Sequence, residues 1–264
     1  ADNLNETLST LVGNVSPTAV SSASEQAKSY LSSLSNLLNT QEGGSYIFSG
    51  LQSSTAPVST SLSSSSLASS IQETVKSMGN GSASDVLSET LSLAKDTSQN
   101  QPFSAALSTD PVTAAQQKLK ITVGTNQTVS AGIVATEGST SSETSTGSPI
   151  RDLMRNLMVV ASLSSDDAGT TDYTQLVQGL QTTNTGVTEG LSDISGSLGI
   201  QQNSLTSQST MLAQMKAALT TQLGTAKDAD LAQVSVQLND TSNQLQASYS
   251  IIANMKGMTL ASYL

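Results

Sequence analysis

The chain has 264 residues, a formal net charge of −10 and only 3% aromatic residues. Its ten basic residues are scattered, which excludes nucleic acid and anionic membrane surfaces as partners, because phosphate neutralisation requires clustered cations. It has no Cys and no His, so disulfides are excluded and the commonest general base and metal ligand are missing. We therefore expect no enzyme activity, no cofactor and no metal site.

Two helices and a short strand are predicted in residues 1–50. Apolar residues recur at helical spacing in residues 4–12 and again in residues 20–37. Ser16-Pro17 starts the second helix with an N-cap followed by proline at the first helical position. Gly43-Gly44 ends the helical pattern, and Tyr46-Ile47-Phe48 is typical of a short apolar strand or of an apolar turn that plugs the end of the helices. We expect these residues to form one helical arm.

Residues 51–148 differ in character, because they are rich in Ser and Thr. Weak amphipathic patterns mark residues 67–78 and 86–94. Residues 119–123 then alternate apolar with polar side chains, and residues 124–127 supply the chemistry of a turn. This pattern predicts a β-hairpin.

Helical periodicity returns at Ser148-Pro149 and is sustained longest in residues 172–223. Apolar residues there repeat every seven positions, which is the heptad of a helix seam. A helix of this length spans about 75 Å, so lengthwise packing against other helices would give a rod. After Gly224 a second heptad is out of phase with the first, which predicts a hinge and a separate C-terminal helix.

The two heptads are interpreted as a coiled-coil seam through which helices or whole subunits pack. Glycines at five positions of the first half each cost about 1 kcal/mol relative to alanine, so neighbouring helices must stabilise it. The predicted assembly seam consists of Val177, Leu180, Leu191, Ile194, Leu198, Leu205, Leu212, Leu219, Leu231, Leu238, Leu245 and Ile252.

The predicted fold is mainly α with a small β part (α+β), an elongated rod of long antiparallel helices with a protruding β-containing middle domain. We expect a discontinuous helical rod domain formed by residues 1–50 and 149–223. Residues 51–148 would form the protruding Ser/Thr-rich domain with the hairpin, and residues 224–264 the C-terminal helix.

Two patterns that could carry chemistry are better explained as ordinary structure. Ser92-Leu93-Ala94-Lys95 matches the Ser-x-x-Lys pattern of serine acyl-enzymes, but a chance match is expected in so Ser-rich a chain and the partner motifs are missing. Asp166, Asp167 and Asp172 lack the alternating ligands and the final Glu of a calcium loop. We interpret the first pattern as an amphipathic helix and the second as a solvated loop.

Three motifs resemble one protein family. Glu42-Gly43-Gly44-Ser45-Tyr46-Ile47-Phe48-Ser49-Gly50 is similar to the segment that closes the first helical arm of bacterial flagellins and flagellar hook-associated proteins. Lys227-Asp228-Ala229-Asp230-Leu231-Ala232 resembles their hinge. Leu245-Gln246-Ala247-Ser248-Tyr249 is similar to their C-terminal helix, and Met258-Thr259-Leu260-Ala261-Ser262-Tyr263-Leu264 to the ending of the subtype that joins hook to filament, hook-associated protein 3.

The resemblance implies an extracellular structural subunit of the bacterial flagellum, secreted through the flagellum's own channel and built into an organelle of motility by self-assembly. Its partners would be neighbouring flagellar subunits, namely hook-associated proteins and flagellin, together with an export chaperone. Residues 224–264 would line the inner tube as a coiled coil. The resemblance implies no catalytic residue.

The family's N-terminal helical segment would precede Ala1. We therefore expect this chain to be monomeric in dilute solution, with residues 228–256 frayed or packed on another copy. Two alternatives remain open. One is filament flagellin itself, and the other is a flagellin-like surface adhesin that binds a glycan or receptor through residues 51–148.

Overall fold

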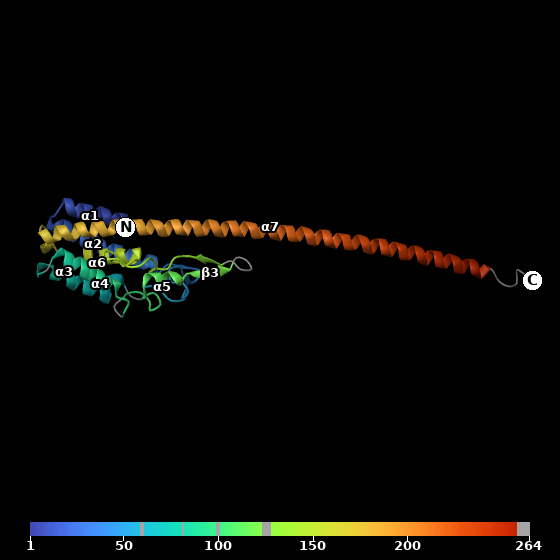
Figure 1. The fold of residues 1–264 in the computed structure, drawn as a ribbon, viewed down its shortest axis with the longest axis horizontal. Helices are drawn as coiled ribbons and strands as arrows, with labels where there is room; N and C mark the ends of the chain where they lie inside the picture. The colour runs from blue at the N-terminus through green and yellow to red at the C-terminus, as the bar shows by residue number, and fades with distance from the viewer. Residues whose placement is uncertain (59–60, 81, 99–100, 123–127, 258–264) are drawn as a thin grey trace, which may run out of the picture. The chain divides into compact units, whose positions relative to one another are not determined.

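The computed structural model describes residues 1–58, 61–80, 82–98, 101–122 and 128–257 (Figure 1). The chain divides into two compact units, Ala1–Asn203 and Ser204–Leu264. Helices dominate the described residues and the strands are short, so the prediction of a mainly α chain with a small β part is confirmed.

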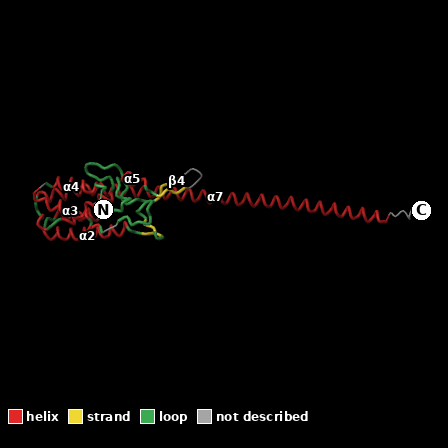
Figure 2. The backbone as a smooth tube through the Cα atoms, turned by 90° about the horizontal axis from the view of Figure 1, so that it is seen from below, coloured by secondary structure: helices red, strands yellow, loops and turns green. Residues whose placement is uncertain are grey.

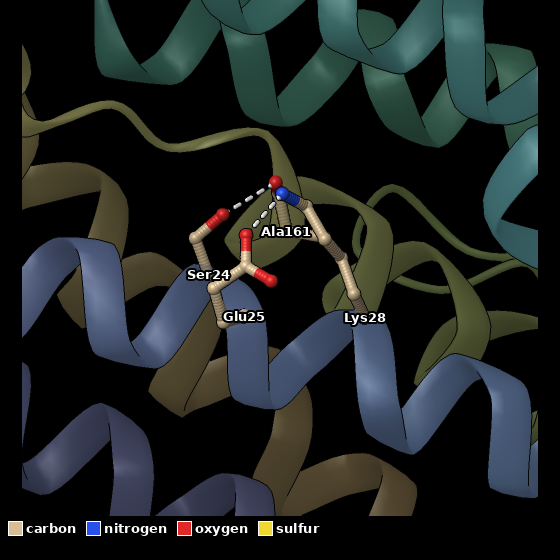
Figure 3. Close-up of polar contacts among 4 residues, drawn as sticks. All are labelled: Ser24, Glu25, Lys28 and Ala161. Atoms are coloured by element: carbon tan, nitrogen blue, oxygen red, sulfur yellow. Dashed lines mark hydrogen bonds and ion pairs between the residues drawn. The ribbon is translucent and has the colours of Figure 1, made fainter.

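The first unit is built on antiparallel helices. Helix α2 (Pro17–Leu38) packs against α6 (Pro149–Ser162), and each begins with proline, which is preset for the first turn. Figure 3 shows the Ser24 hydroxyl of α2 donating to the Ala161 carbonyl at 2.7 Å, beside an exposed ion pair between Lys28 and Glu25. The hydroxyl bond fixes the register of the two helices at the C-terminal end of α6.

Helix α1 (Asp2–Gly13) packs antiparallel to α2 and also to the start of α7 (Thr171–Gly257). The Thr7 hydroxyl donates to the Gln26 side chain at 3.1 Å, across the contact with α2. On the other side, the Asn184 amide of α7 donates to the Asn5 side chain at 2.7 Å. Asn184 is fully buried, and an unpaired amide N–H there would destabilise the core. Its bond to Asn5 satisfies one of these N–H groups.

Two shorter helices cover α6, and they correspond to the amphipathic patterns in the Ser/Thr-rich region. They are α3 (Ser66–Lys76) and α4 (Ala83–Lys95), and α4 begins with a capping box formed by Ser82 and Asp85. Both amphipathic patterns therefore lie mainly on helices. The remaining short elements are η1 (Leu62–Ser64), η2 (Ser77–Asn80), α5 (Pro111–Gln116) and η3 (Ser165–Asp167).

Two hairpins make up the β part. Strands β1 (Gln41–Glu42) and β2 (Ser45–Tyr46) are joined by Gly43 and Gly44, whose positive φ values of 58° and 81° suit a tight hairpin turn. Strands β3 (Leu119–Thr122) and β4 (Thr128–Ala131) pair antiparallel and are drawn in yellow in Figure 2. The hairpin predicted there is confirmed, and its turn lies outside the described residues.

Helix α6 is buried on all sides and carries the only two arginines of the chain. The Arg151 guanidinium donates to the carbonyls of Leu107 and Thr109 at 2.8 and 2.7 Å and lies 5.7 Å from the centre of the Phe103 ring. Burial lowers the pKa of Arg151 to about 10, and Asp110 and Asp152 oppose that shift. The guanidinium thus joins α6 to the segment before α5.

Helix α7 is continuous over 87 residues, from Thr171 to Gly257. The helix break predicted at Gly224 is therefore wrong. A single glycine costs only about 1 kcal/mol in a helix interior, which does not suffice to end one. None of the helices in the described part of the chain combines the length and the hydropathy needed to cross a membrane.

Candidate assembly surface

The large apolar side chains of α7 between Met211 and Ile252, within the second unit, are exposed. Leu205 is half-buried, whereas Leu219 and Leu223 are 63% and 71% exposed. Side chains of this size are usually covered, and a contiguous row of them marks a protein-binding surface. We name this row the C-terminal stripe: Leu205, Leu212, Leu219, Leu223, Leu231, Val234, Leu238, Leu245 and Ile252.

The C-terminal stripe crosses the point where the two heptads lose phase. Leu212, Leu223, Val234 and Leu245 follow one another at intervals of eleven residues. Eleven residues make about three helical turns, so this row drifts by only about 20° at each step. Sequence reasoning from heptads alone missed Leu223 as a member of the stripe. An eleven-residue period would have revealed it.

The predicted assembly seam is divided between two environments. Val177 and Leu180 are fully buried within the first unit, where they belong to its hydrophobic core. Leu191 and Ile194 are half-buried, and Leu198 is 40% exposed. The seven remaining members, from Leu205 to Ile252, all lie in the C-terminal stripe. A role for these twelve residues in assembly stays a prediction.

A shallow hollow lies on the second unit. Its lining consists of Val234, Gln237, Leu238, Thr241, Ser242 and Leu245, and the first four of these stand at positions i, i+3, i+4 and i+7 of the helix. Four residues at this spacing form the hole that receives one side chain of a partner helix in knobs-into-holes packing. The surface is therefore shaped for another helix.

Hydroxyl groups along this part of α7 are already hydrogen-bonded to their own helix. They donate to the carbonyl four residues earlier, at distances between 2.8 and 3.0 Å. The donors are Thr210, Thr220, Thr221, Thr225, Thr241 and Ser248. A hydroxyl that is satisfied in this way can be covered by a partner without leaving a buried donor unpaired.

Few charged side chains lie along the same segment. Lys227 and Asp230 flank the middle of the C-terminal stripe, and neither forms an ion pair with any residue that the structure describes. Apolar side chains are also exposed away from the stripe, at Met211, Met215 and Val236. At about 100° of rotation per residue, these lie roughly 90–150° around the helix from the middle of the stripe. Apolar surface is thus available on more than one side of the helix.

The motif at residues 42–50 lies elsewhere, in the first unit, and has a structural role. The backbone N–H of Ala135 donates to the Phe48 carbonyl at 2.9 Å, and Ser49 forms a β-bridge with Val134. Gly50 follows with φ of 62°, and a Cβ on it would lie 2.6 Å from the Gln117 carbonyl. Only glycine fits at position 50. The contacts of Phe48 and Ser49 anchor the helical arm to the segment after β4.

Chemistry is not favoured at the other patterns that the sequence contains. Lys95 donates to the backbone carbonyl of Ser142, in keeping with an ordinary helix end. Asp167 accepts from the Ser164 backbone N–H at 2.9 Å, as part of a capping box. Within the described ranges, no three acidic side chains gather into a group that could hold a metal ion.

Comparison with known proteins bears on the same part of the chain. Residues 180–264 match the model of the bacterial flagellin C-terminal helical region. No curated protein and no solved structure matches the chain. The C-terminal stripe therefore lies within a segment that is similar to the C-terminal helical region of bacterial flagellins.

Proposed function

We propose that the chain is a structural subunit of the bacterial flagellum that joins hook to filament through lengthwise helix packing. The observation that carries this proposal is the C-terminal stripe, an exposed apolar row on a helix that is similar to the flagellin C-terminal helical region. A helix of this kind is stable mainly when a partner covers its apolar face. Its natural environment is accordingly an assembly.

More than one neighbour is expected in that assembly. The stripe suits one partner helix, while Met211, Met215 and Val236 present apolar surface on another side. A subunit that is surrounded on several sides is typical of a polymer. The neighbours in this proposal are other flagellar subunits, namely hook-associated proteins and flagellin, and residues 51–148 form the part that protrudes from the helical rod.

Before assembly, the exposed stripe is a liability because apolar rows promote aggregation. We propose that an export chaperone covers it inside the cell and that the subunit then acts outside the cell, in the flagellum. In dilute solution without such partners, the chain is expected to be monomeric.

Electron microscopy of a strain that lacks the gene tests the junction role. The expected result is cells that bear hooks without filaments and release filament monomer into the medium. Cells with complete hooks and junctions that make no filament monomer would instead identify the chain as filament flagellin. Normal filaments would contradict both flagellar roles.

Complementation of that strain with the intact chain carrying point changes tests the stripe itself. Leu219→Asp and Leu238→Asp place charges on the stripe and are expected to abolish filament attachment. Gln214→Asp and Ala232→Asp add the same charge on the opposite side of the helix, so they serve as matched controls and should restore motility. Equal behaviour of the two pairs would contradict assembly through the stripe.

A further inference from the structure

Eight of the nine residues of the C-terminal stripe keep the same spacing when the sequence is read backwards. They pair symmetrically about the midpoint between positions 228 and 229: Leu205 with Ile252, Leu212 with Leu245, Leu219 with Leu238, and Leu223 with Val234. Leu231 is the exception, because Ala226 occupies its symmetric position. We propose that two copies of this chain associate through residues 205–252 of α7 as an antiparallel, two-fold symmetric helix pair. This self-association does not require the flagellar role.

Antiparallel symmetry brings each of these eight residues opposite another apolar member of the stripe. An isologous two-fold contact requires that residue i of one copy meets residue j of the second while j meets i. The four pairs fulfil this condition on both sides of the midpoint, so eight apolar layers would extend over about 70 Å of helix. All eight side chains lie within about 50° of one line along the helix, at about 100° of rotation per residue.

Charge decides between the two possible orientations. Around the same midpoint, Lys227 lies opposite Asp230 of the second copy, and this pair occurs twice because of the symmetry. In a parallel pair of the same register, Lys227 would face Lys227 and Asp230 would face Asp230, which is repulsive. Neither side chain has an ion-pair partner among the described residues, so both are free to form these contacts.

The hollow on α7 supplies a steric argument for the same register. Four of its lining residues, Val234, Gln237, Leu238 and Thr241, surround a point between Gln237 and Leu238. In the antiparallel arrangement, the side chain opposite this point is Leu219 of the second copy, which is 63% exposed and long enough to act as the knob. Thr241 lines the hollow, and its hydroxyl already donates to the Gln237 carbonyl at 2.8 Å. A partner that covers Thr241 therefore does not leave this hydroxyl as an unpaired donor.

Sedimentation equilibrium of the intact chain over a range of concentrations tests the association. We expect monomer at low concentration and a reversible dimer as the concentration rises. Asp230→Lys should raise the dimer dissociation constant about tenfold or more, because it places Lys227 opposite a lysine. Asp240→Lys changes the net charge equally but lies off the stripe, and it should have little effect. The double variant Lys227→Asp with Asp230→Lys should restore the affinity.

Disulfide trapping tests the orientation of the two helices. Because the chain has no native cysteine, only the introduced cysteines can form a disulfide. Leu223→Cys and Val234→Cys variants are oxidised alone and as a mixture. In the antiparallel pair only the mixture forms a covalent dimer efficiently. Two copies of one variant hold their sulfurs about 16 Å apart along the axis, beyond the reach of a disulfide.

Several results would overturn the proposal. Monomer at every concentration would exclude self-association. Efficient trapping of either single variant would indicate a parallel pair, and an equal loss of affinity for Asp230→Lys and Asp240→Lys would exclude the register. A chain that stays monomeric but restores filament attachment in the deletion strain would refute this pairing while leaving the flagellar function intact.

Discussion

The two ends of α7 carry the same kind of apolar repeat in opposite environments. In residues 171–191, Tyr173, Leu176 and Leu180 are fully buried against the other helices of the first unit. Between Met211 and Ile252, the large apolar side chains of the second unit are exposed. Periodicity therefore specifies which face of a helix is apolar, but it does not specify whether that face is covered within the chain or by a partner.

The largest expected difference between the two regions is in amide hydrogen exchange. Buried helices open only with the global unfolding of their unit, whereas a helix without a partner frays. In dilute solution, residues 204–257 should exchange at least about 100-fold faster than residues 171–191. Hydrogen exchange followed by mass spectrometry measures both regions in one sample. Equal protection at low concentration would contradict the comparison.

The next largest difference is expected in the cost of replacing a leucine by alanine. Leu180→Ala removes a fully buried side chain and is expected to lower the free energy of unfolding of the first unit by about 2–5 kcal/mol. Leu238 is 70% exposed, so Leu238→Ala should change this free energy of unfolding by less than about 0.5 kcal/mol. Tyrosine fluorescence during urea unfolding reports on the first unit once Tyr249 and Tyr263 are changed to phenylalanine, because Tyr30, Tyr46 and Tyr173 lie in that unit and the chain has no Trp.

Replacing a glycine by alanine should lower stability in the first region and raise it in the second. A Cβ at Gly190 would lie 2.5 Å from the Pro149 ring, and overpacking of this kind costs about 1–3 kcal/mol. At Gly224 nothing lies within 4 Å of the added Cβ, so Gly224→Ala should stabilise the helix by about 1 kcal/mol. Urea unfolding measures the first variant, and circular dichroism of helix content the second. A destabilised Gly224→Ala would mean that this glycine has a partner.

Acid should weaken the first unit slightly. The pKa values of Asp85 and Asp110 lie below 3.8 because each carboxylate accepts hydrogen bonds at a helix N-terminus, from Ser82 and Thr113 respectively. Their contribution is present above the unfolded value of 3.8 and is lost as the pH falls through the lower folded values. Asp85→Asn and Asp110→Asn should flatten the acid limb of a thermal-unfolding profile between pH 5 and about pH 2. An unchanged acid limb would exclude these two caps as its cause.

Local patterns predicted the helices and the hairpin because their causes are local. Ser16-Pro17 starts a helix and Gly43-Gly44 forms a tight hairpin turn whatever surrounds them. The burial of Arg151 could not be predicted in this way. It depends on the carbonyls of Leu107 and Thr109, which the fold brings from more than forty residues away.

The candidate surface was predictable in part. The heptads identified seven of its members, but Gly224 suggested a break that the continuous helix does not have. That supposed break obscured the eleven-residue row through Leu223 and Val234. Which heptads would be buried within the chain could not be read from the sequence, because the buried Val177 and the exposed Leu219 are six heptads apart and occupy equivalent positions of the repeat.

The threonine and serine hydroxyls of α7 that donate to their own helix have a consequence for selectivity. Those donors are already hydrogen-bonded. An acceptor on a neighbouring helix therefore changes the binding free energy little at these positions. Discrimination among neighbours must then come from side-chain shape and from the few charges on this segment. Exchange of one apolar helix for another on this face should accordingly be easy, which suits a component that meets a succession of different neighbours.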